Sequence, residues 1–170
     1  MDTTLTLRRA RPDDLDQVDR LLRASYPRLL KADYPPSVMV LALPLISKAR
    51  PELLASGRYF IVEGADGEIL GAGGWSLSSQ LDGRSADQAA HVRHVATHPD
   101  HLRQGIGRAI LGEVVVDCLR HGLRWLDCLS TRTAVPFYER LGFRMVQPMD
   151  VNLGPGIRFP ALRMLRQISL

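Results

Sequence analysis

Hydrophobic and polar residues in the first third of the chain follow first the period of a strand and then that of a helix. Residues 5–10 alternate as in a strand, and Pro12 with two acidic residues then suits a first helical turn. The apolar positions that follow recur at helical spacing: Leu15, Val18, Leu21 and Leu22. We predict that this helix ends near Tyr26-Pro27, and that residues 38–43 and 46–54 form short helices between prolines.

From residue 58 the pattern changes to a period of two. We predict strands over residues 59–63 and 69–77, joined by an Asp-Gly hairpin turn at residues 65–68. The second of these strands carries Gly71, Gly73 and Gly74, which indicate a bulge or the close approach of another segment. A polar loop over residues 78–88 then leads to the second half of the chain.

Strands and helices alternate along this second half. A strand is expected over residues 90–97, with His91, Arg93, Val95 and Thr97 on one face and Val92, His94 and Ala96 on the other. Helices are expected over residues 108–123 and 134–141, and strands over 124–129, 143–150 and 157–165. The succession predicts an α/β sandwich built on a mixed sheet. An exposed last strand over residues 158–165 would be able to pair across a homodimer.

A glycine-containing turn connects the strand 90–97 to the helix 108–123. Pro99 and Asp100 open the turn, and Gly105-Ile106-Gly107 leads into the helix. Glycines let the backbone approach a ligand closely, and the first N–H groups of a helix have no partner inside it, so phosphate is favoured there. The sequence lacks the third glycine of a dinucleotide motif and the Gly-Lys-Ser/Thr of a P-loop. We therefore predict a compact pyrophosphate site with Arg103 and Arg108 at its rim.

Composition narrows the class of protein. The 170 residues are 45% hydrophobic and 24% charged, as in an ordinary globular protein, and we expect one domain over residues 1–170. The net charge of +4 and a pI near 9.5 fit an anionic ligand or, alternatively, nucleic acid. Two cysteines and five histidines provide neither a disulfide framework nor a metal site. With no apolar run of membrane length and no leader pattern, we expect a cytoplasmic protein.

A second motif follows the glycine turn after about thirty residues: Ala134-Val135-Pro136-Phe137-Tyr138-Glu139-Arg140-Leu141-Gly142-Phe143. Together the two motifs resemble the GNAT superfamily of N-acetyltransferases, at motif level from about His91 to Phe143. The resemblance implies a three-layer α/β sandwich. Its mixed, mostly antiparallel sheet of about seven strands is splayed between strands four and five and has helices on both faces. It also implies acetyl-CoA as a co-substrate, without a metal.

The resemblance assigns the cofactor-binding residues position by position. Val95, Ala96 and Thr97 would lend backbone groups to the pantetheine arm of acetyl-CoA. The pyrophosphate loop would consist of Arg103, Gln104, Gly105, Ile106, Gly107 and Arg108. The family often has an asparagine seven residues before the tyrosine of the second motif; here it is Thr131, and Ser130 or Thr131 would take over its contact. The loop also has Leu102 where the family usually has Arg or Gln, but its grip is mostly through the backbone.

The resemblance also suggests the residues that move protons. Tyr138 stands where the family commonly has the tyrosine that protonates the departing CoA thiolate. Many members place a glutamate early on the fourth strand to accept the amine proton, and His91 falls near that position. Histidine suits this role because its pKa is ordinarily near neutrality. His94 and Asp127 are two further candidates for the base.

The implied reaction moves an acetyl group from acetyl-CoA to a primary amine by direct attack in a ternary complex. Two alternatives remain open from the sequence: a non-catalytic acyl-CoA-binding or sensor domain, and a basic nucleic-acid-binding module. We expect a small-molecule or peptide amine as acceptor, bound by residues 28–57, the strand around Trp75 and the loop 78–88, and no membrane partner. Tyr26 and Tyr34 are candidate lining residues, while Asp33 and Asp82 weakly favour a cationic acceptor.

Overall fold

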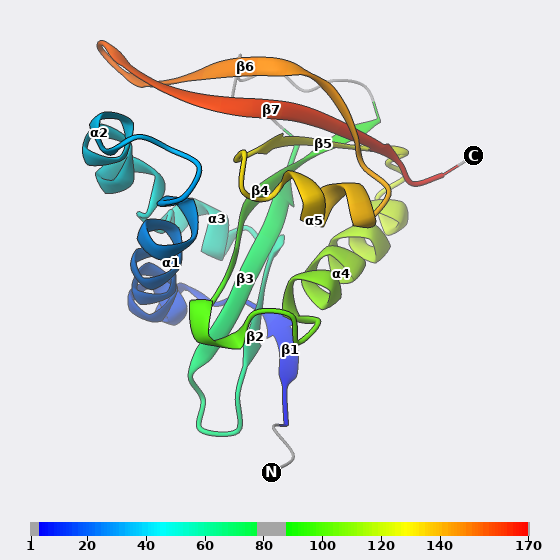
Figure 1. Cartoon of the computed structure of the whole chain (residues 1–170). Helices are drawn as coiled ribbons and strands as arrows, with labels where there is room; N and C mark the ends of the chain where they lie inside the picture. The colour runs from blue at the N-terminus through cyan, green and yellow to red at the C-terminus, as the bar shows by residue number, and fades with distance from the viewer. Residues whose placement is uncertain (1–3, 78–87, 170) are drawn as a thin grey trace.

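The computed structural model describes residues 4–77 and 88–169, whose strands form one seven-stranded sheet (Figure 1). The strands are β1 (Thr6–Arg9), β2 (Tyr59–Glu63), β3 (Ile69–Ser76), β4 (Ala89–Thr97), β5 (Trp125–Ser130), β6 (Arg144–Gly154) and β7 (Ile157–Gln167). Their order across the sheet is β1-β2-β3-β4-β5-β7-β6. Only the pairing of β4 with β5 is parallel, and the other five are antiparallel, so the predicted mixed, mostly antiparallel sheet is confirmed.

Helices cover both faces of this sheet, as predicted. Figure 1 shows α1 (Leu15–Leu30), α2 (Pro36–Ile46) and α3 (Pro51–Ala55) on one side, and α4 (Ile106–Arg120) and α5 (Val135–Arg140) on the other. Strand β2 serves both layers because its side chains alternate. Tyr59 and Ile61 pack with α1 and α3, whereas Phe60 and Val62 pack with α4. None of the described helices is both long and apolar enough to cross a membrane.

Glycines in β3 allow α4 to lie very close to the sheet. A Cβ atom on Gly71 would come within 2.2 Å of Ile106 Cγ2, and one on Gly73 within 2.8 Å of Ile110 Cγ2. Any larger residue would therefore push the first turns of α4 away from the strands. The predicted bulge or close approach at these glycines is confirmed, and it fixes where the N-terminus of α4 lies.

The N-terminal helices differ from the prediction. Helix α1 continues through Pro27 to Leu30, because burial of Leu30 against Tyr34 and Met39 offsets the backbone hydrogen bond that a proline removes. Helix α2 covers the predicted segment 38–43 but begins at Pro36 and ends at Ile46. The expected helix 46–54 is only the five-residue α3, since Pro51 suits a first helical position. All but Gln88 of the predicted polar loop 78–88 lies outside the described residues.

The expectation that the last strand is an exposed edge is wrong. Strand β7 pairs with β6 over residues 157–165 and with β5 over residues 162–167, so it lies inside the sheet, with both edges hydrogen-bonded from residue 162 to residue 165. The edge strand is instead β6, which Figure 1 shows along the outer border of the sheet. Over residues 162–165 the predicted homodimer pairing therefore has no free edge to use.

Candidate active site at the fork between β4 and β5

Strands β4 and β5 lie side by side only over a short stretch. Their parallel pairing covers residues 89–91 opposite residues 125–127 and ends at the pair His91 and Asp127. Beyond this pair β4 continues to Thr97 and β5 to Ser130 without pairing to each other, which confirms the predicted splay. A cavity of about 1320 Å³ is lined by the separated strands together with the helices on both sides.

Most of the predicted site residues line this one cavity. They are Val95, Ala96, Thr97, Arg103, Gly105, Ile106, Gly107, Arg108, Ser130, Thr131 and Tyr138. Gln104 and His91 are not among the lining residues, although His94 and Leu102 are. The fold thus brings the end of β4, the glycine turn and α5 together, although α5 follows the turn by some thirty residues.

A bulge in β4 shapes the wall of the cavity. Ala72 pairs with Ala96 and Gly74 with Arg93, so β4 has one more residue than β3 in this interval. His94 takes a φ of 48°, in the left-handed region, and its carbonyl oxygen accepts a hydrogen bond from the Tyr59 hydroxyl at 2.9 Å. Because a bulge leaves a residue outside the hydrogen-bonded ladder, backbone groups here are free to face the cavity.

The bulge also corrects the predicted faces of this strand. Strict alternation placed Val95 opposite Val92 and together with Arg93. In the structure Val92 and Val95 both pack on the α4 side, while Ala96 packs on the α1 side. The additional residue at His94 reverses the alternation for the rest of the strand.

The glycine turn lines the cavity at the start of α4. Arg103 and Gly105 adopt φ values of 59° and 78°, and a 3₁₀ turn at Pro99–His101 precedes them. The Ala109 N–H donates to the Gly105 carbonyl at 2.9 Å, so the N–H groups one turn earlier have no helical carbonyl to reach. A Cβ on Gly107 would lie 3.0 Å from the Phe137 ring, which shows how closely α5 covers this turn. The arrangement suits an anion held by backbone N–H groups.

Tyr138 presents its side chain to the cavity from α5. The residue is buried, and its hydroxyl is in hydrogen-bonding contact with the Cys128 thiol at the end of β5. Burial raises the pKa of Tyr138 well above its ordinary value, and burial likewise raises the pKa of the Cys128 thiol to about 12. Both groups therefore keep their protons at neutral pH, and Tyr138 is able to donate one.

Ser130 and Thr131 connect β5 to α5. The Ser130 hydroxyl donates to the Thr131 carbonyl at 2.7 Å, and the Ala134 N–H donates to the Thr131 hydroxyl oxygen at 3.2 Å. Thr131 thus satisfies a backbone group in the turn that precedes α5, where the family often has asparagine. Both residues also line the cavity.

His91 lies at the base of the fork, where β4 and β5 are still paired. It is buried, and its Nδ1 is 3.7 Å from Asp127 Oδ2. Asp127 is also bound by Arg163 of β7, whose Nη2 lies 3.0 Å from Oδ2. Two of the three candidate bases are therefore neighbours in one charged cluster behind the cavity.

His94, the third candidate, lines the cavity directly. Burial, with the nearby positive charges of Arg93 and Arg50, lowers the pKa of His94 to about 4. The imidazole is therefore neutral at physiological pH but a weak base. Sequence reasoning did not single out Arg93 or Arg50. A charged residue in the middle of a buried strand was the available signal for Arg93.

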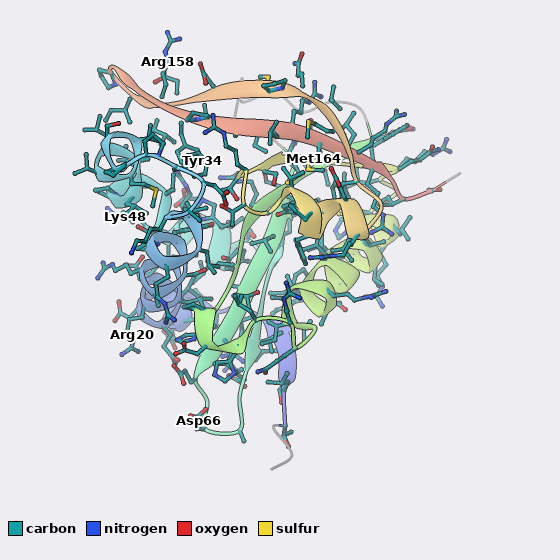
Figure 2. The ribbon with its side chains drawn as sticks, in the orientation of Figure 1. Arg20, Tyr34, Lys48, Asp66, Arg158 and Met164 are labelled. Carbon is teal, nitrogen blue, oxygen red and sulfur yellow. The ribbon has the colours of Figure 1, made fainter. Side chains whose placement is uncertain are left out.

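The expected acceptor-binding residues are only partly found at the cavity. Tyr26 lines it, and burial raises the pKa of Tyr26 to about 12. Tyr34 is instead used in packing: it stacks on Phe159, and its hydroxyl donates to the Pro160 carbonyl at 2.7 Å, beneath β7 (Figure 2). Asp33 accepts a hydrogen bond from Thr133 at 2.6 Å and is not a lining residue. Asp82 lies outside the described residues.

Within residues 4–77 and 88–169, no group of three or more His, Cys, Asp or Glu side chains is placed to hold a metal ion. The chemistry that the described residues offer is binding of an anionic, elongated ligand next to a protonated tyrosine. Comparison with known proteins leads in the same direction. Residues 55–145 match the family model described as the "Acetyltransferase (GNAT) domain".

A curated relative shares part of the sequence. The [Ribosomal protein bS18]-alanine N-acetyltransferase of Escherichia coli K12 is 37% identical over 57 residues. The match spans 32% of this chain and 38% of that relative, so it covers well under two thirds of either protein.

Solved structures with the same fold extend over nearly the whole chain. A GCN5-related N-acetyltransferase from Rhodopseudomonas palustris superposes with a TM-score of 0.78 at 19% identity, covering 98% of both chains. The PaiA N-acetyltransferase from Thermoplasma acidophilum, solved in complex with coenzyme A, gives a TM-score of 0.72 at 14% identity, covering 96% of this chain and 99% of that one. At these identities the likeness establishes the shared architecture.

Proposed function

The chain belongs to the GNAT acetyltransferase family, and we propose that it transfers an acetyl group from acetyl-CoA to an amine bound in the same cavity. The observation that carries the proposal is the convergence at the β4–β5 fork. The start of α4, which suits an anion, and the protonated hydroxyl of Tyr138 line one cavity there. Acetyl-CoA needs the first for its phosphates and the second for its thioester.

The residues present fit acetyl-CoA as a substrate. We expect the N–H groups of Gly105–Arg108, with Arg103 and Arg108 beside them, to hold the pyrophosphate. Backbone groups of Val95, Ala96 and Thr97 are the partners for the pantetheine arm, since β4 has no neighbouring β5 strand at these positions. The Ser25 hydroxyl donates to the Thr97 carbonyl at 3.0 Å and thereby fixes α1 against this end of β4.

The proposed reaction is a direct transfer. The amine nitrogen attacks the thioester carbonyl carbon, the C–N bond forms, the C–S bond breaks, and the thiolate takes a proton from Tyr138. We expect backbone N–H groups at the β4 bulge to polarise the carbonyl oxygen as the amine attacks. Tyr138 carries a proton at neutral pH, so it has one to give to the thiolate that forms beside it.

The proton that the amine loses needs a second acceptor. We propose that it passes through water to His91, whose imidazolium the neighbouring Asp127 would stabilise at 3.7 Å. His94 faces the cavity but is too weakly basic, with a pKa of about 4, to compete. His91→Gln should therefore lower kcat/KM at pH 7 by about 10-fold or more, and His94→Gln by less. A larger loss in His94→Gln would reverse this assignment.

The first test of the proposed function is thermal unfolding with acetyl-CoA, using NADH and ATP as controls. Binding to the folded state raises the midpoint, so acetyl-CoA alone should raise it. The second test is release of free thiol from acetyl-CoA with a panel of amines. No rise in the midpoint at saturating acetyl-CoA would overturn the proposal. A rise without thiol release from any amine would favour the acyl-CoA sensor alternative.

A further inference from the structure

Arg93 occupies an unusual position in the middle of β4. It lines the cavity one residue before the bulge at His94, where the acetyl group is expected to react. Its Nη1 donates to the Ser76 hydroxyl at 3.0 Å, and its Nε is buried without a hydrogen-bond partner among the described residues. A guanidinium carries five N–H donors, so most of its capacity is unused by the parts of the chain that the structure describes.

Two other partly buried arginines, Arg8 and Arg163, each reach an aspartate oxygen at 2.9–3.0 Å. The partly buried Arg58 instead lies over the Trp75 ring, 4.9 Å from its centroid. Arg93 forms no such ion pair within residues 4–77 and 88–169. Because a partly buried charge without a counter-charge is costly, the arrangement at Arg93 indicates a group that the bound ligand supplies.

The charges around Arg93 favour an anion. Six of the residues lining the cavity are Arg or Lys, namely Lys48, Arg50, Arg93, Arg103, Arg108 and Arg140, and the one acidic lining residue among those described is Glu52. Glu52 lies 3.9 Å from Arg50, and its side chain is 73% exposed. Burial and the positive charge of Arg50 lower the pKa of Arg93, which means that its charged form is disfavoured. A negative group bound beside Arg93 would stabilise that charged form.

The phosphates of acetyl-CoA do not account for this anion site. Arg93 precedes Thr97 by four residues, about 13 Å along an extended strand, and the pyrophosphate loop begins only after Thr97 and a further turn. The side chains that share its surroundings, Arg50 and Glu52, come instead from the segment around α3 on the opposite side of the cavity. Lys48 lies in the same segment, beside the N-terminal helices in Figure 2.

We propose that Arg93 binds a carboxylate of the amine acceptor, so that the acceptor is a free amino acid or a similarly small amine bearing a carboxylate. This inference rests on the proposed function. The planar guanidinium matches a carboxylate in shape and donors, and Arg50 and Lys48 add positive charge at the edge of the cavity. A polyamine or another polycation is disfavoured here, because it would meet three cations and a single carboxylate. This reverses the weak expectation of a cationic acceptor.

The same cations assist the chemistry. An amine attacks a thioester only in its neutral form, and nearby positive charges lower the pKa of a bound ammonium group. The cations that bind the carboxylate of the acceptor would therefore also ease the loss of a proton from its ammonium group. Arg93 would act as a specificity-determining residue rather than as a group that exchanges protons.

The test compares matched ligands on the protein saturated with coenzyme A. Each pair consists of an amino acid and its carboxamide, drawn from alanine, methionine, phenylalanine and glutamate, and putrescine represents a polyamine. We expect at least one acid to raise the unfolding midpoint and to bind at least 10-fold more tightly than its amide, with putrescine without effect. In Arg93→Met this preference should disappear, while Arg93→Lys should recover part of it.

Arg158→Met is the matched control, since Arg158 is exposed at the far end of β7 and its side chain points away from the molecule in Figure 2. The control should keep the full preference for the acid. The inference is overturned if every amide binds as tightly as its matched acid. It is also overturned if Arg93→Met keeps the preference for the acid over the amide. Either result would leave the proposed function intact, because acetyl-CoA binding and thiol release are measured separately. Unchanged coenzyme A binding by Arg93→Met shows that the variant is folded.

Discussion

The two walls of the cavity differ in the groups that they offer to a ligand. The wall formed by the glycine turn and α4 offers backbone N–H groups, held in place by glycines that admit close packing. The wall formed by residues 48–52 and the middle of β4 offers long charged side chains, of which Arg50 is 51% exposed. Ligand binding by backbone N–H groups is fixed by the local geometry of the turn. Ligand binding by charged side chains depends on which segments the fold brings together.

The two walls also differ in how firmly they are packed. Helix α4 buries Ile106, Ile110 and Val114 in the main core, against the glycines of β3. Helix α2, on the other wall, leaves Val40 69% and Leu41 52% exposed. We call the wall of the glycine turn and α4 the cofactor wall, and the wall of residues 48–52 and the middle of β4 the acceptor wall, after the ligands that we propose for them. The cofactor wall is tied to the main core through α4, whereas the exposed Arg50 and Glu52 of the acceptor wall can vary without loss of a core side chain.

Tyr138, which faces the space between the two walls, should give the largest effect. Tyr138→Phe removes the proton donor but keeps the ring in the core, so we expect kcat to fall about 100-fold with acetyl-CoA affinity unchanged. Steady-state thiol release and calorimetry measure the two quantities. Tyr34→Phe is the control, since Tyr34 packs under β7 outside the cavity and its loss should leave kcat intact. An unchanged kcat in Tyr138→Phe would remove Tyr138 from the mechanism.

The partly buried His94 should make the acceptor wall sensitive to acid. Its pKa is about 4 in the folded protein and 6.5 when unfolded, so between these values the unfolded chain binds more protons. The free energy of unfolding should therefore fall by about 2 kcal/mol from pH 7 to pH 5 because of this residue. Urea titrations at both pH values measure the loss, which His94→Gln should abolish. A loss of equal size in His94→Gln would assign it to another group.

A methyl group on the cofactor wall should weaken acetyl-CoA binding selectively. In Gly107→Ala the new Cβ lies 3.0 Å from the Phe137 ring, beside the expected phosphate site. We expect about fivefold weaker acetyl-CoA binding, close to 1 kcal/mol, and no change in the preference among amines. Gly112→Ala in the same helix is the control because its Cβ meets nothing within 4 Å. Equal acetyl-CoA affinities in the two variants would contradict this account of the turn.

The smallest effect is expected at the exposed edge of the acceptor wall. Arg50→Met removes a cation that is half exposed and already near Glu52, so a carboxylate-bearing acceptor should lose only about threefold in KM. The loss should shrink in high salt, since exposed charges are screened. A loss as large as that of Arg93→Met, measured under the same conditions, would show that the two arginines act as one site.

Sequence reasoning was most successful where a residue type has a local geometric meaning. Gly71 and Gly73 predicted a bulge or a close approach, and α4 packs against them. The predicted glycine turn is found before α4, with Gly105 at a φ of 78°. It failed where a distant contact decides the outcome. The sequence left Tyr34 open between lining the acceptor pocket and packing, and the structure uses it to hold the N-terminal helices to β7. Asp33 binds Thr133 just before α5, and α1 passes through Pro27 because Leu30 is buried by residues outside the helix.

By itself, the sequence determined the order of the strands and the glycine turn that leads into α4, because period, glycine and capping patterns are local properties of the chain. The tertiary structure alone decided three features. They are the bulge that reverses the faces of β4 at His94, the insertion of β7 between β5 and β6, and the placement of Arg93 beside Arg50. Each depends on the register and packing of segments far apart in the chain, which no local pattern specifies.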